Sequence, residues 1–207
     1  MAKRPLNISS KVIDAALSCA LKVGWRDVSL QMIATDAGIS LGKLHANYPS
    51  KTAIVAAIMD ETTSTVIDRS DLSVLGEPIH DRLLDTVLRR FDAMEVNKAA
   101  ITSILRETML DPLGTLSLVP RFLNAMTWTL ESAGISSAGL AGKLRVKGLA
   151  TIYLAALAVW IGDDTPDLAK TMAFLDRRLK QAMRLSTFLP FGADDHHIGK
   201  NNDSFCL

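Results

Sequence analysis

Residues 29–51, SLQMIATDAGISLGKLHANYPSK, hold two short apolar segments that are separated by a glycine and closed by a proline. Ser29 and Ser40 stand where helix N-caps are favoured, Gly38 breaks the first segment, and Pro49 ends the second. Isolated helices of about two turns are marginal in water, so tertiary packing must stabilise both. The spacing therefore predicts a helix-turn-helix packed on a preceding helix.

Helical periodicity continues through most of the chain, and the alternation typical of strands is nearly absent. Gly24 is a helix stop signal, whereas Thr165-Pro166-Asp167 is a helix start signal. The expected helices cover residues 10–23 with Ser10 as cap, 30–37, 51–69, 79–95, 98–109, 117–133, 140–161 and 167–186, and a third helix in chain order is capped by Ser40 and ended by Pro49. Pro112, Gly114 and Pro120 are expected as punctuation. The sequence predicts an all-α fold.

Composition allows a sizeable core, because 48% of the 207 residues are apolar. The net charge of +1 hides an asymmetry. Residues 1–60 contain seven Lys or Arg against four Asp or Glu, whereas residues 61–207 contain sixteen against eighteen. This excess favours an anionic partner for the first third of the chain, although scatter in surface charge is the alternative.

The sequence shows no sign of export or of membrane insertion. Cys19 and Cys206 are too few for a disulfide framework, and Cys19 is expected to be a buried small apolar residue. The start, MAKRPLNISSK, contains no apolar signal segment. The longest apolar run, residues 148–161, is shorter than the roughly 20 residues that span a bilayer. We expect a soluble cytoplasmic protein with no membrane span.

Catalytic and metal-binding motifs are missing from the sequence. It has no glycine-rich phosphate loop, no G-x-S-x-G and no H-E-x-x-H. Asp194, Asp195, His196 and His197 resemble a metal cluster in composition, but they lie in a polar tail and are expected to be a solvated run. We expect no enzymatic activity, no cofactor and no metal site.

The second helix of the motif is expected to present an outward ridge. With the inner faces buried, Leu41, Gly42, Lys43, His45, Ala46 and Asn47 remain outside, on a helix of a size that fits the DNA major groove. The alternatives are a solvated Lys43, a His45 packed on the next helix and an Asn47 that ends its own helix. Candidate DNA-binding residues are Ser29, Gln31, Ser40, Leu41, Gly42, Lys43, His45, Asn47, Tyr48 and Lys51.

Residues 10–58 resemble the TetR family of bacterial transcription regulators. The resemblance is carried by an amphipathic first helix ending in Gly24-Trp25, followed by VSLQMIATDAGISLGKLHANYPSKTAI. It implies three N-terminal helices that bind DNA and a larger helical domain that binds small molecules and forms a dimer. Lys51 matches the family's phosphate-contacting lysine. His45 replaces the usual tyrosine, which implies altered base preference or weaker DNA binding, and Lys43 and Tyr48 replace a usual Thr or Ser and a usual Phe.

Residues 160–179, WIGDDTPDLAKTMAFLDRRL, are similar to a second family. This is the ubiquinone-biosynthesis lipid-binding family, which shares the TetR fold. The similarity implies an apolar tunnel for an isoprenoid-like lipid and no DNA binding.

The resemblance implies three regions: a DNA-binding domain in residues 1–50, an effector-binding and dimerisation domain in residues 51–187 with residues 51–69 as the connecting helix, and a tail in residues 188–207. A helix-packing seam predicts dimer contacts at Leu149, Ile152, Ala156, Trp160, Leu168, Met172, Leu175 and Leu179, with an ordinary monomeric core as the alternative.

Candidate effector residues are aromatic, methionine or aliphatic side chains, which are more often core: Phe91, Met94, Ile104, Met109, Phe122, Met126, Trp128 and Tyr153. Arg106 and Glu107 either anchor a polar ligand end or pair with each other or with water. The leading interpretation is a homodimeric repressor that binds a double-stranded DNA operator and is released by a small apolar effector. The alternative is a lipid-binding accessory protein without DNA binding.

Overall fold

The computed structural model describes residues 8–68 and 76–187, and these contain nine α-helices and no strand. The all-α expectation is confirmed. The helices are α1 (Ile8–Val23), α2 (Leu30–Asp36), α3 (Leu41–Asn47), α4 (Lys51–Asp68), α5 (Ile79–Glu95), α6 (Lys98–Leu110), α7 (Pro112–Ser132), α8 (Gly139–Ile161) and α9 (Ala169–Thr187).

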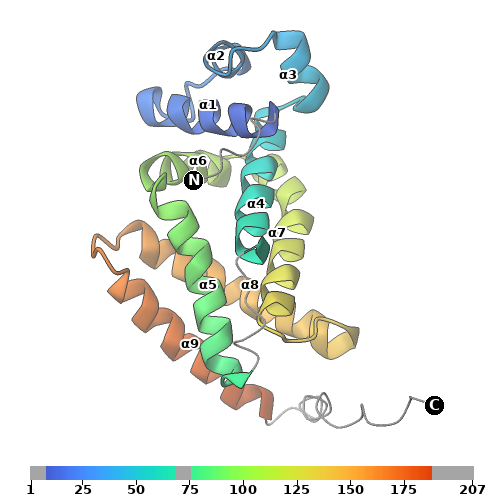
Figure 1. Cartoon of the computed structure of the whole chain (residues 1–207), viewed down its shortest axis with the longest axis vertical. Helices are drawn as coiled ribbons and strands as arrows, with labels where there is room; N and C mark the ends of the chain where they lie inside the picture. The colour runs from blue at the N-terminus through green and yellow to red at the C-terminus, as the bar shows by residue number, and fades with distance from the viewer. Residues whose placement is uncertain (1–7, 69–75, 188–207) are drawn as a thin grey trace, which may run out of the picture.

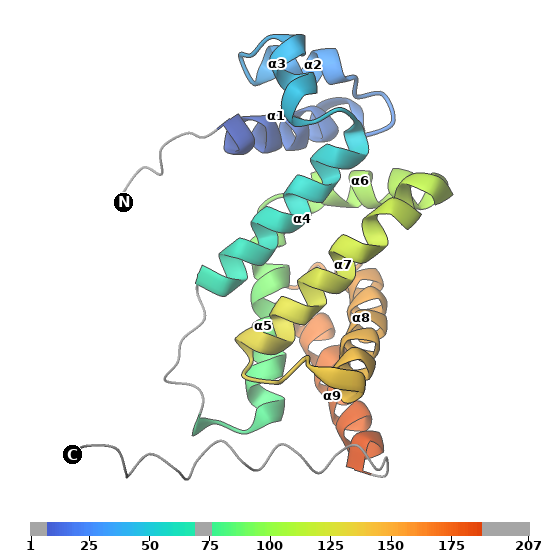
Figure 2. The same ribbon diagram turned by 90° about the vertical axis from the view of Figure 1, so that its right-hand side faces the viewer.

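Two groups of helices follow each other along the long axis of the molecule. Helices α1 to α3, called the head below, lie at one end, and α4 leads from them into the remaining helices, called the body (Figure 1). Helix α6 runs beneath α1, and α4 lies alongside α7 in both views (Figure 2). Among described helix pairs in extensive contact, the head meets the body only where α1 packs on α4 and on α6.

The head is built on the apolar face of α1. Val12, Ala16 and Cys19 are buried there, which confirms the expectation for Cys19. The helix ends at Gly24, whose φ of 80° lies in the left-handed region that favours glycine. Trp25 follows and is buried, so the turn after α1 closes the head core from the side.

The body core centres on stacked aromatic rings. The ring centroids of Phe91 and Tyr153 are 5.0 Å apart, and those of Phe91 and Trp160 are 5.9 Å apart. Offset and tilted pairs at such distances add to the stabilisation from burial. The cluster packs α5 against α8 in the core of the body.

Three helix starts differ from the expectation. Helix α1 begins at Ile8, so Ser10 lies inside it. Helix α7 begins with Pro112 in its first turn and continues through Pro120 to Ser132. Asp111 caps this start by accepting a hydrogen bond from the Gly114 amide at 3.0 Å, and a proline is tolerated in a first turn. Pro120, expected as punctuation close to a helix start at residue 117, is exposed and lies well inside α7, at the cost of one backbone hydrogen bond.

The start of α9 also shifts. Leu168, with a φ of 53°, interrupts the helix that was expected from residue 167, and α9 begins at Ala169. The Thr165 hydroxyl accepts a hydrogen bond from the Ala169 amide at 2.9 Å, so Thr165 caps the helix from four residues away. The buried Asp163 carboxylate accepts hydrogen bonds from the amide and hydroxyl of Thr165 and of Thr171. Asp163 thus sets the turn that displaces the helix start.

Most residues of the expected dimer seam are buried within one chain. Leu149, Ala156, Trp160, Leu168, Leu175 and Leu179 are buried, Ile152 is half-buried, and Met172 is exposed. Within one chain, α8 packs on α9 and α7, and α9 packs on α5. The dimer contacts of these residues stay a prediction.

By length and composition, one helix of the described residues, α8, is apolar enough to cross a membrane, and 39% of the window that qualifies is buried. Within the same residues, no group of three or more His, Cys, Asp or Glu side chains is placed to hold a metal ion. Residues 69–75 and the tail in residues 188–207, which includes 194–197, lie outside the described residues.

Candidate nucleic-acid interface

The turn between α2 and α3 has the geometry that the sequence predicts. Ser29 accepts a hydrogen bond from the Met32 amide at 3.1 Å, and Ser40 accepts one from the Lys43 amide at 3.2 Å. Gly38 adopts a φ of 66°, which a residue with a Cβ adopts only under strain. The two helices are thus capped at their starts and joined by a sharp turn.

The inner faces of α2 and α3 are buried in the core of the head. Ile33, Ala34 and Leu44 are fully buried. The Tyr48 hydroxyl donates a hydrogen bond to the Ser9 hydroxyl of α1 at 2.9 Å, so the end of α3 is fastened to the first helix. Tyr48, a predicted DNA-binding residue, is half-buried at this contact. Packing on α1 therefore stabilises helices that are too short to persist alone.

The outer face of α3 forms an uncovered ridge at the tip of the molecule (Figure 1). We call it the recognition face; its exposed residues are Leu41, Gly42, Lys43, His45, Ala46 and Asn47. A Cβ placed on Gly42 meets nothing within 4 Å, so this position is open to close approach. The Asn47 side-chain amide donates to the Lys43 carbonyl at 2.8 Å, which matches the helix-end alternative for that residue. His45 is exposed rather than packed on α4.

One more predicted residue, Gln31, lies on α2, and Ser50, which was not among the candidates, stands at the start of α4. Gln31 is exposed on α2, and its amide donates to the Thr35 hydroxyl at 3.4 Å. Ser50 caps α4, accepting a hydrogen bond from the Ala53 amide at 3.1 Å. Helices α2, α3 and α4 therefore each start at a serine whose hydroxyl caps the helix. Phosphate oxygens are favoured near such helix starts.

Lys51 has an internal role that the sequence did not reveal. Its ammonium donates to the Trp25 carbonyl, lies 3.4 Å from the Arg26 carbonyl, and is 4.7 Å from the centroid of the Trp25 ring. Burial lowers the pKa of Lys51, with the charges of Glu107 and Asp27 acting in the opposite direction. Lys51 thus links the start of α4 to the turn after α1. In the sequence, the Gly24-Trp25 pair was the available sign that this turn needs a partner.

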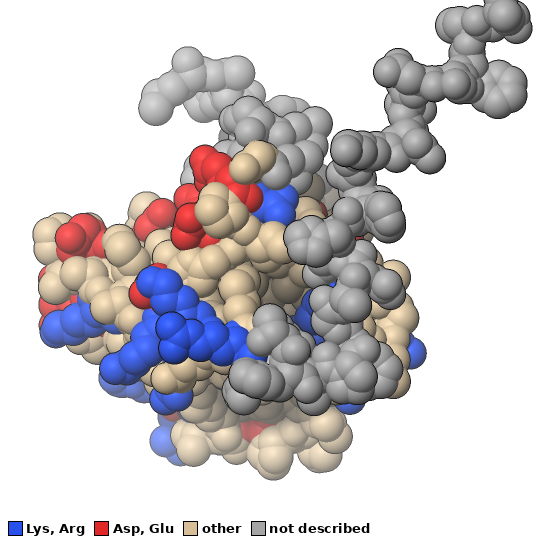
Figure 3. All heavy atoms as spheres, turned by 90° about the horizontal axis from the view of Figure 1, so that it is seen from below, with Lys and Arg blue, Asp and Glu red and all other residues tan. Residues whose placement is uncertain are grey.

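Charge alone does not identify the interface. Seen from the end of the molecule opposite the head, Lys and Arg side chains gather in one cluster, and Asp and Glu side chains lie at its edge and elsewhere on this face (Figure 3). A basic surface is therefore not unique to the head. The shape and exposure of the recognition face carry the assignment.

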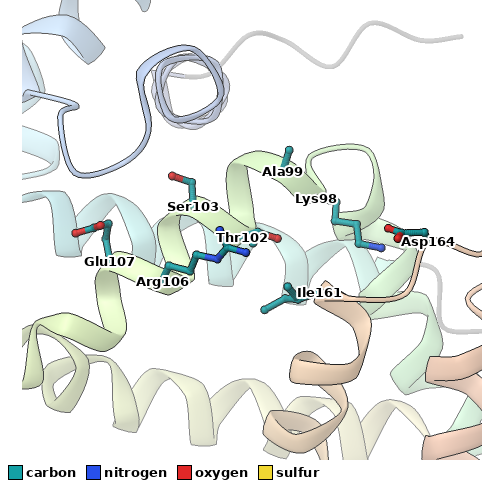
Figure 4. Close-up of a pocket in the computed structure, with 8 residues that line it drawn as sticks. All are labelled: Lys98, Ala99, Thr102, Ser103, Arg106, Glu107, Ile161 and Asp164. Atoms are coloured by element: carbon teal, nitrogen blue, oxygen red, sulfur yellow. The ribbon is translucent and has the colours of Figure 1, made fainter.

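A direct hydrogen bond connects head and body. The Trp25 amide donates to the Ser103 hydroxyl of α6 at 2.8 Å. Beside this bond, on the side of α6, is an open pocket of about 610 Å³ (Figure 4). Its lining comes from α6 and from the end of α8, and it includes Arg106 and Glu107. Sequence reasoning singled out these last two residues but not Ser103.

The predicted effector residues do not line that pocket. Phe91, Met94, Ile104, Met126 and Tyr153 are buried in the body core, and Phe122 is half-buried. Met109 and Trp128 are 68% and 46% exposed, so they do not face the interior as expected, because their helices turn these positions outward. Of the inner residues, Phe91, Phe122 and Met94 contact Tyr153.

Comparisons with known proteins agree with this geometry. Residues 12–58 match the family model described as bacterial regulatory proteins, tetR family, and residues 146–186 match the family model COQ9. No curated protein matches the chain.

Several solved structures share the fold. A TetR transcriptional regulator from Nitrosomonas europaea is 21% identical over 86% of this chain and 98% of its own, with a TM-score of 0.71. A TetR regulator from Rhodococcus sp. RHA1 is 17% identical over 84% and 94%, with a TM-score of 0.65. The regulator FadR from Bacillus subtilis, in complex with stearoyl-CoA, is 16% identical over 82% and 96%, with a TM-score of 0.56. The chain thus has the fold of the TetR transcriptional regulators, and its head carries that family's sequence match.

Proposed function

We propose that the protein is a DNA-binding transcription regulator, a repressor that a small apolar effector releases from its operator. The observation that carries this proposal is the recognition face. It stands clear of the body, begins at a capped helix N-terminus, and offers Lys43 and His45 to a groove. The family match over residues 12–58 and the shared fold support the same role. The role involves no catalytic step and belongs in the cytoplasm, where bacterial DNA lies.

The proposed division of the chain follows the arrangement of the helices. Residues 1–50 contain the head, and residues 51–187 contain the body that binds effector. Helix α4 belongs to the body and connects the two. A ligand that prefers one tilt of α4 shifts the population of head positions, and DNA affinity changes with it.

We further propose that two copies pair through the outward side of α8. This side, called the α8 stripe, consists of exposed and mostly small residues spaced by four and three positions: Leu144, Gly148, Thr151, Ala155 and Ala158. Small residues at such spacing let two helices approach closely. Pairing about a two-fold axis places two recognition faces on half-sites about 34–36 Å apart or a multiple of that.

Selection of genomic fragments at low salt tests the DNA-binding proposal. The full chain is expected to enrich one imperfectly palindromic site. Replacing Lys43 by alanine is expected to weaken binding and to reduce the slope of log affinity against log salt by about 0.9, because one phosphate contact is lost. Lys180→Ala, which removes an exposed charge on α9, is the control and should change neither quantity. Failure to enrich any site contradicts the proposal.

A lipid-binding accessory protein is the second candidate. The COQ9 match over residues 146–186, which includes the Asp163 turn, favours it. Lipids retained by the purified native protein can be identified by mass spectrometry. An isoprenoid-like lipid together with no DNA binding supports this candidate, and a selective operator contradicts it.

A further inference from the structure

Helix α5 carries two arginines that face the interior of the body. Arg82 is 9% exposed and Arg90 is 4% exposed, and the Nε of each is buried without a hydrogen-bond partner. Within the part of the chain that the structure describes, neither guanidinium forms an ion pair with a carboxylate. A charge that leaves water without a counter-ion is strongly destabilising. Binding of an anion at this position would remove that cost.

Arg90 stands between a polar contact and an aromatic cluster. Its Nη1 donates to the Thr63 hydroxyl of α4 at 3.3 Å. On the other side, its Cζ lies 5.6 Å from the centroid of the Tyr153 ring. Tyr153 also stacks on Phe91, and its centroid is 5.9 Å from that of Phe122. The guanidinium is thus a buried charge at the edge of an apolar and aromatic region.

The protein's own groups do not neutralise Arg90. Burial raises the pKa of the Tyr153 phenol, and the positive charge of Arg90 and its hydrogen bond to the phenol act in the opposite direction, so the phenol remains protonated at neutral pH. The Thr63 hydroxyl, the Tyr153 phenol and the Tyr153 ring face are all neutral, and they compensate only part of the lost hydration. A structural role alone is served better by an apolar side chain of similar size.

A carboxylate suits the unsatisfied geometry. The planar guanidinium can offer Nε and a terminal nitrogen side by side, which matches the two oxygens of a carboxylate. Met94, whose Sδ is 3.9 Å from the Tyr153 hydroxyl, is unbranched and can change rotamer to admit the apolar part of a ligand.

We propose that the effector is an apolar molecule bearing one carboxylate, which pairs with Arg90 while the cluster of Phe91, Phe122 and Tyr153 contacts its apolar part. The word effector rests on the proposed regulator function, whereas the binding chemistry is independent of DNA. The carboxylate competes with Thr63 for the guanidinium and so acts directly on α4. A neutral isoprenoid lipid lacks the group that Arg90 requires.

Matched probes test the chemistry on the unmodified full chain. Calorimetric titration compares dodecanoate with dodecanol and 4-phenylbutyrate with 4-phenylbutanol, below the concentrations at which the probes form micelles. At least one carboxylate is expected to bind at least about tenfold more tightly than its alcohol, as a charged hydrogen-bonded pair implies. Binding of no carboxylate, or equal binding of acid and alcohol, overturns the proposal.

A pair of adjacent variants tests the residue. Arg90→Met is expected to weaken carboxylate binding roughly 10- to 100-fold and to leave alcohol binding unchanged. Its unfolding midpoint without ligand should not fall, because a buried unpaired charge is removed. Arg89→Met is the control, since Arg89 is half-buried on the same helix and pairs with Asp85 at 2.6 Å, and it should retain carboxylate binding.

Unchanged carboxylate binding in Arg90→Met overturns the assignment. If that variant does not fold, the comparison of acid with alcohol on the unmodified chain still decides. A chain that selects an operator but binds no carboxylate refutes only this inference. A chain that binds carboxylate through Arg90 but selects no operator refutes only the regulator function.

Discussion

At the scale of single residues, Asp163 determines how α9 begins. Its carboxylate accepts two amide and two hydroxyl hydrogen bonds from Thr165 and Thr171, at distances between 2.5 and 3.2 Å. Burial by itself raises the pKa of this carboxyl, but the four hydrogen bonds outweigh burial and hold the pKa well below its ordinary value of 3.8. The ionised form is therefore the one that the fold requires.

Asp163→Asn is expected to lower the free energy of unfolding by about 2–3 kcal/mol, because an amide cannot accept all four bonds. Since the folded-state pKa is depressed, the stabilisation is complete above the unfolded-state pKa and is lost as pH falls below about 4. Denaturant melts at pH 7 and pH 3 measure both effects. Asp164→Asn, at the exposed neighbour, is the control. Equal acid sensitivity of the Asp163 variant and the parent contradicts the prediction.

At the scale of elements, the helix-turn-helix follows closely from sequence, because its signals are local. Capping serines, one left-handed glycine and a terminal proline set its boundaries within a residue. The start of α7 at Pro112 did not follow, because a proline stops a helix only where its missing bond and its ring cannot be accommodated, and a first turn or an exposed position such as that of Pro120 accommodates both.

Two glycines of the motif are predicted to respond in opposite ways. Gly38→Ala is expected to destabilise the protein by about 1–2 kcal/mol, because its φ of 66° is left-handed. Gly42→Ala is expected to stabilise it by up to about 1 kcal/mol, because Gly42 is helical with open space around it.

Thermal or denaturant melts measure the two stabilities. The more stable Gly42 variant is nevertheless expected to bind DNA more weakly, since its methyl group enters the recognition face. Tighter or unchanged operator binding by Gly42→Ala contradicts the assigned contact.

At the scale of the whole molecule, periodicity reveals apolar faces but not what covers them. The seam at Leu149, Ala156 and Leu175 has the spacing of a helix interface, and it packs inside the monomer. Arg90 was missed for a related reason. From sequence alone, a charged residue is expected at the surface. The position of Arg90 on the same side of α5 as Val87, Phe91 and Met94 could have indicated that it is buried. Tertiary context decides both cases.

The α8 stripe gives the prediction for assembly. Ala155→Arg is expected to raise the dimer dissociation constant at least about 100-fold, because a long charged side chain replaces a methyl group where two helices approach. Asn124→Arg, at an exposed position of α7, is the control. Sedimentation velocity of both variants measures the change. A dimer that persists unchanged in Ala155→Arg shows that copies do not pair through this side.

Helix α4 is unbroken over its 18 residues, and this has a mechanical consequence. A straight rod amplifies rotation with distance from its pivot. If Thr63 is the fulcrum, the start of the rod lies about 18 Å away, and a rotation of roughly 10° displaces it by roughly 3 Å. Two such rods swinging in opposite senses alter the span between the tips by about twice that amount. A ligand no larger than a fatty acid can then change the spacing of the two recognition faces so that they no longer match successive major grooves of the DNA.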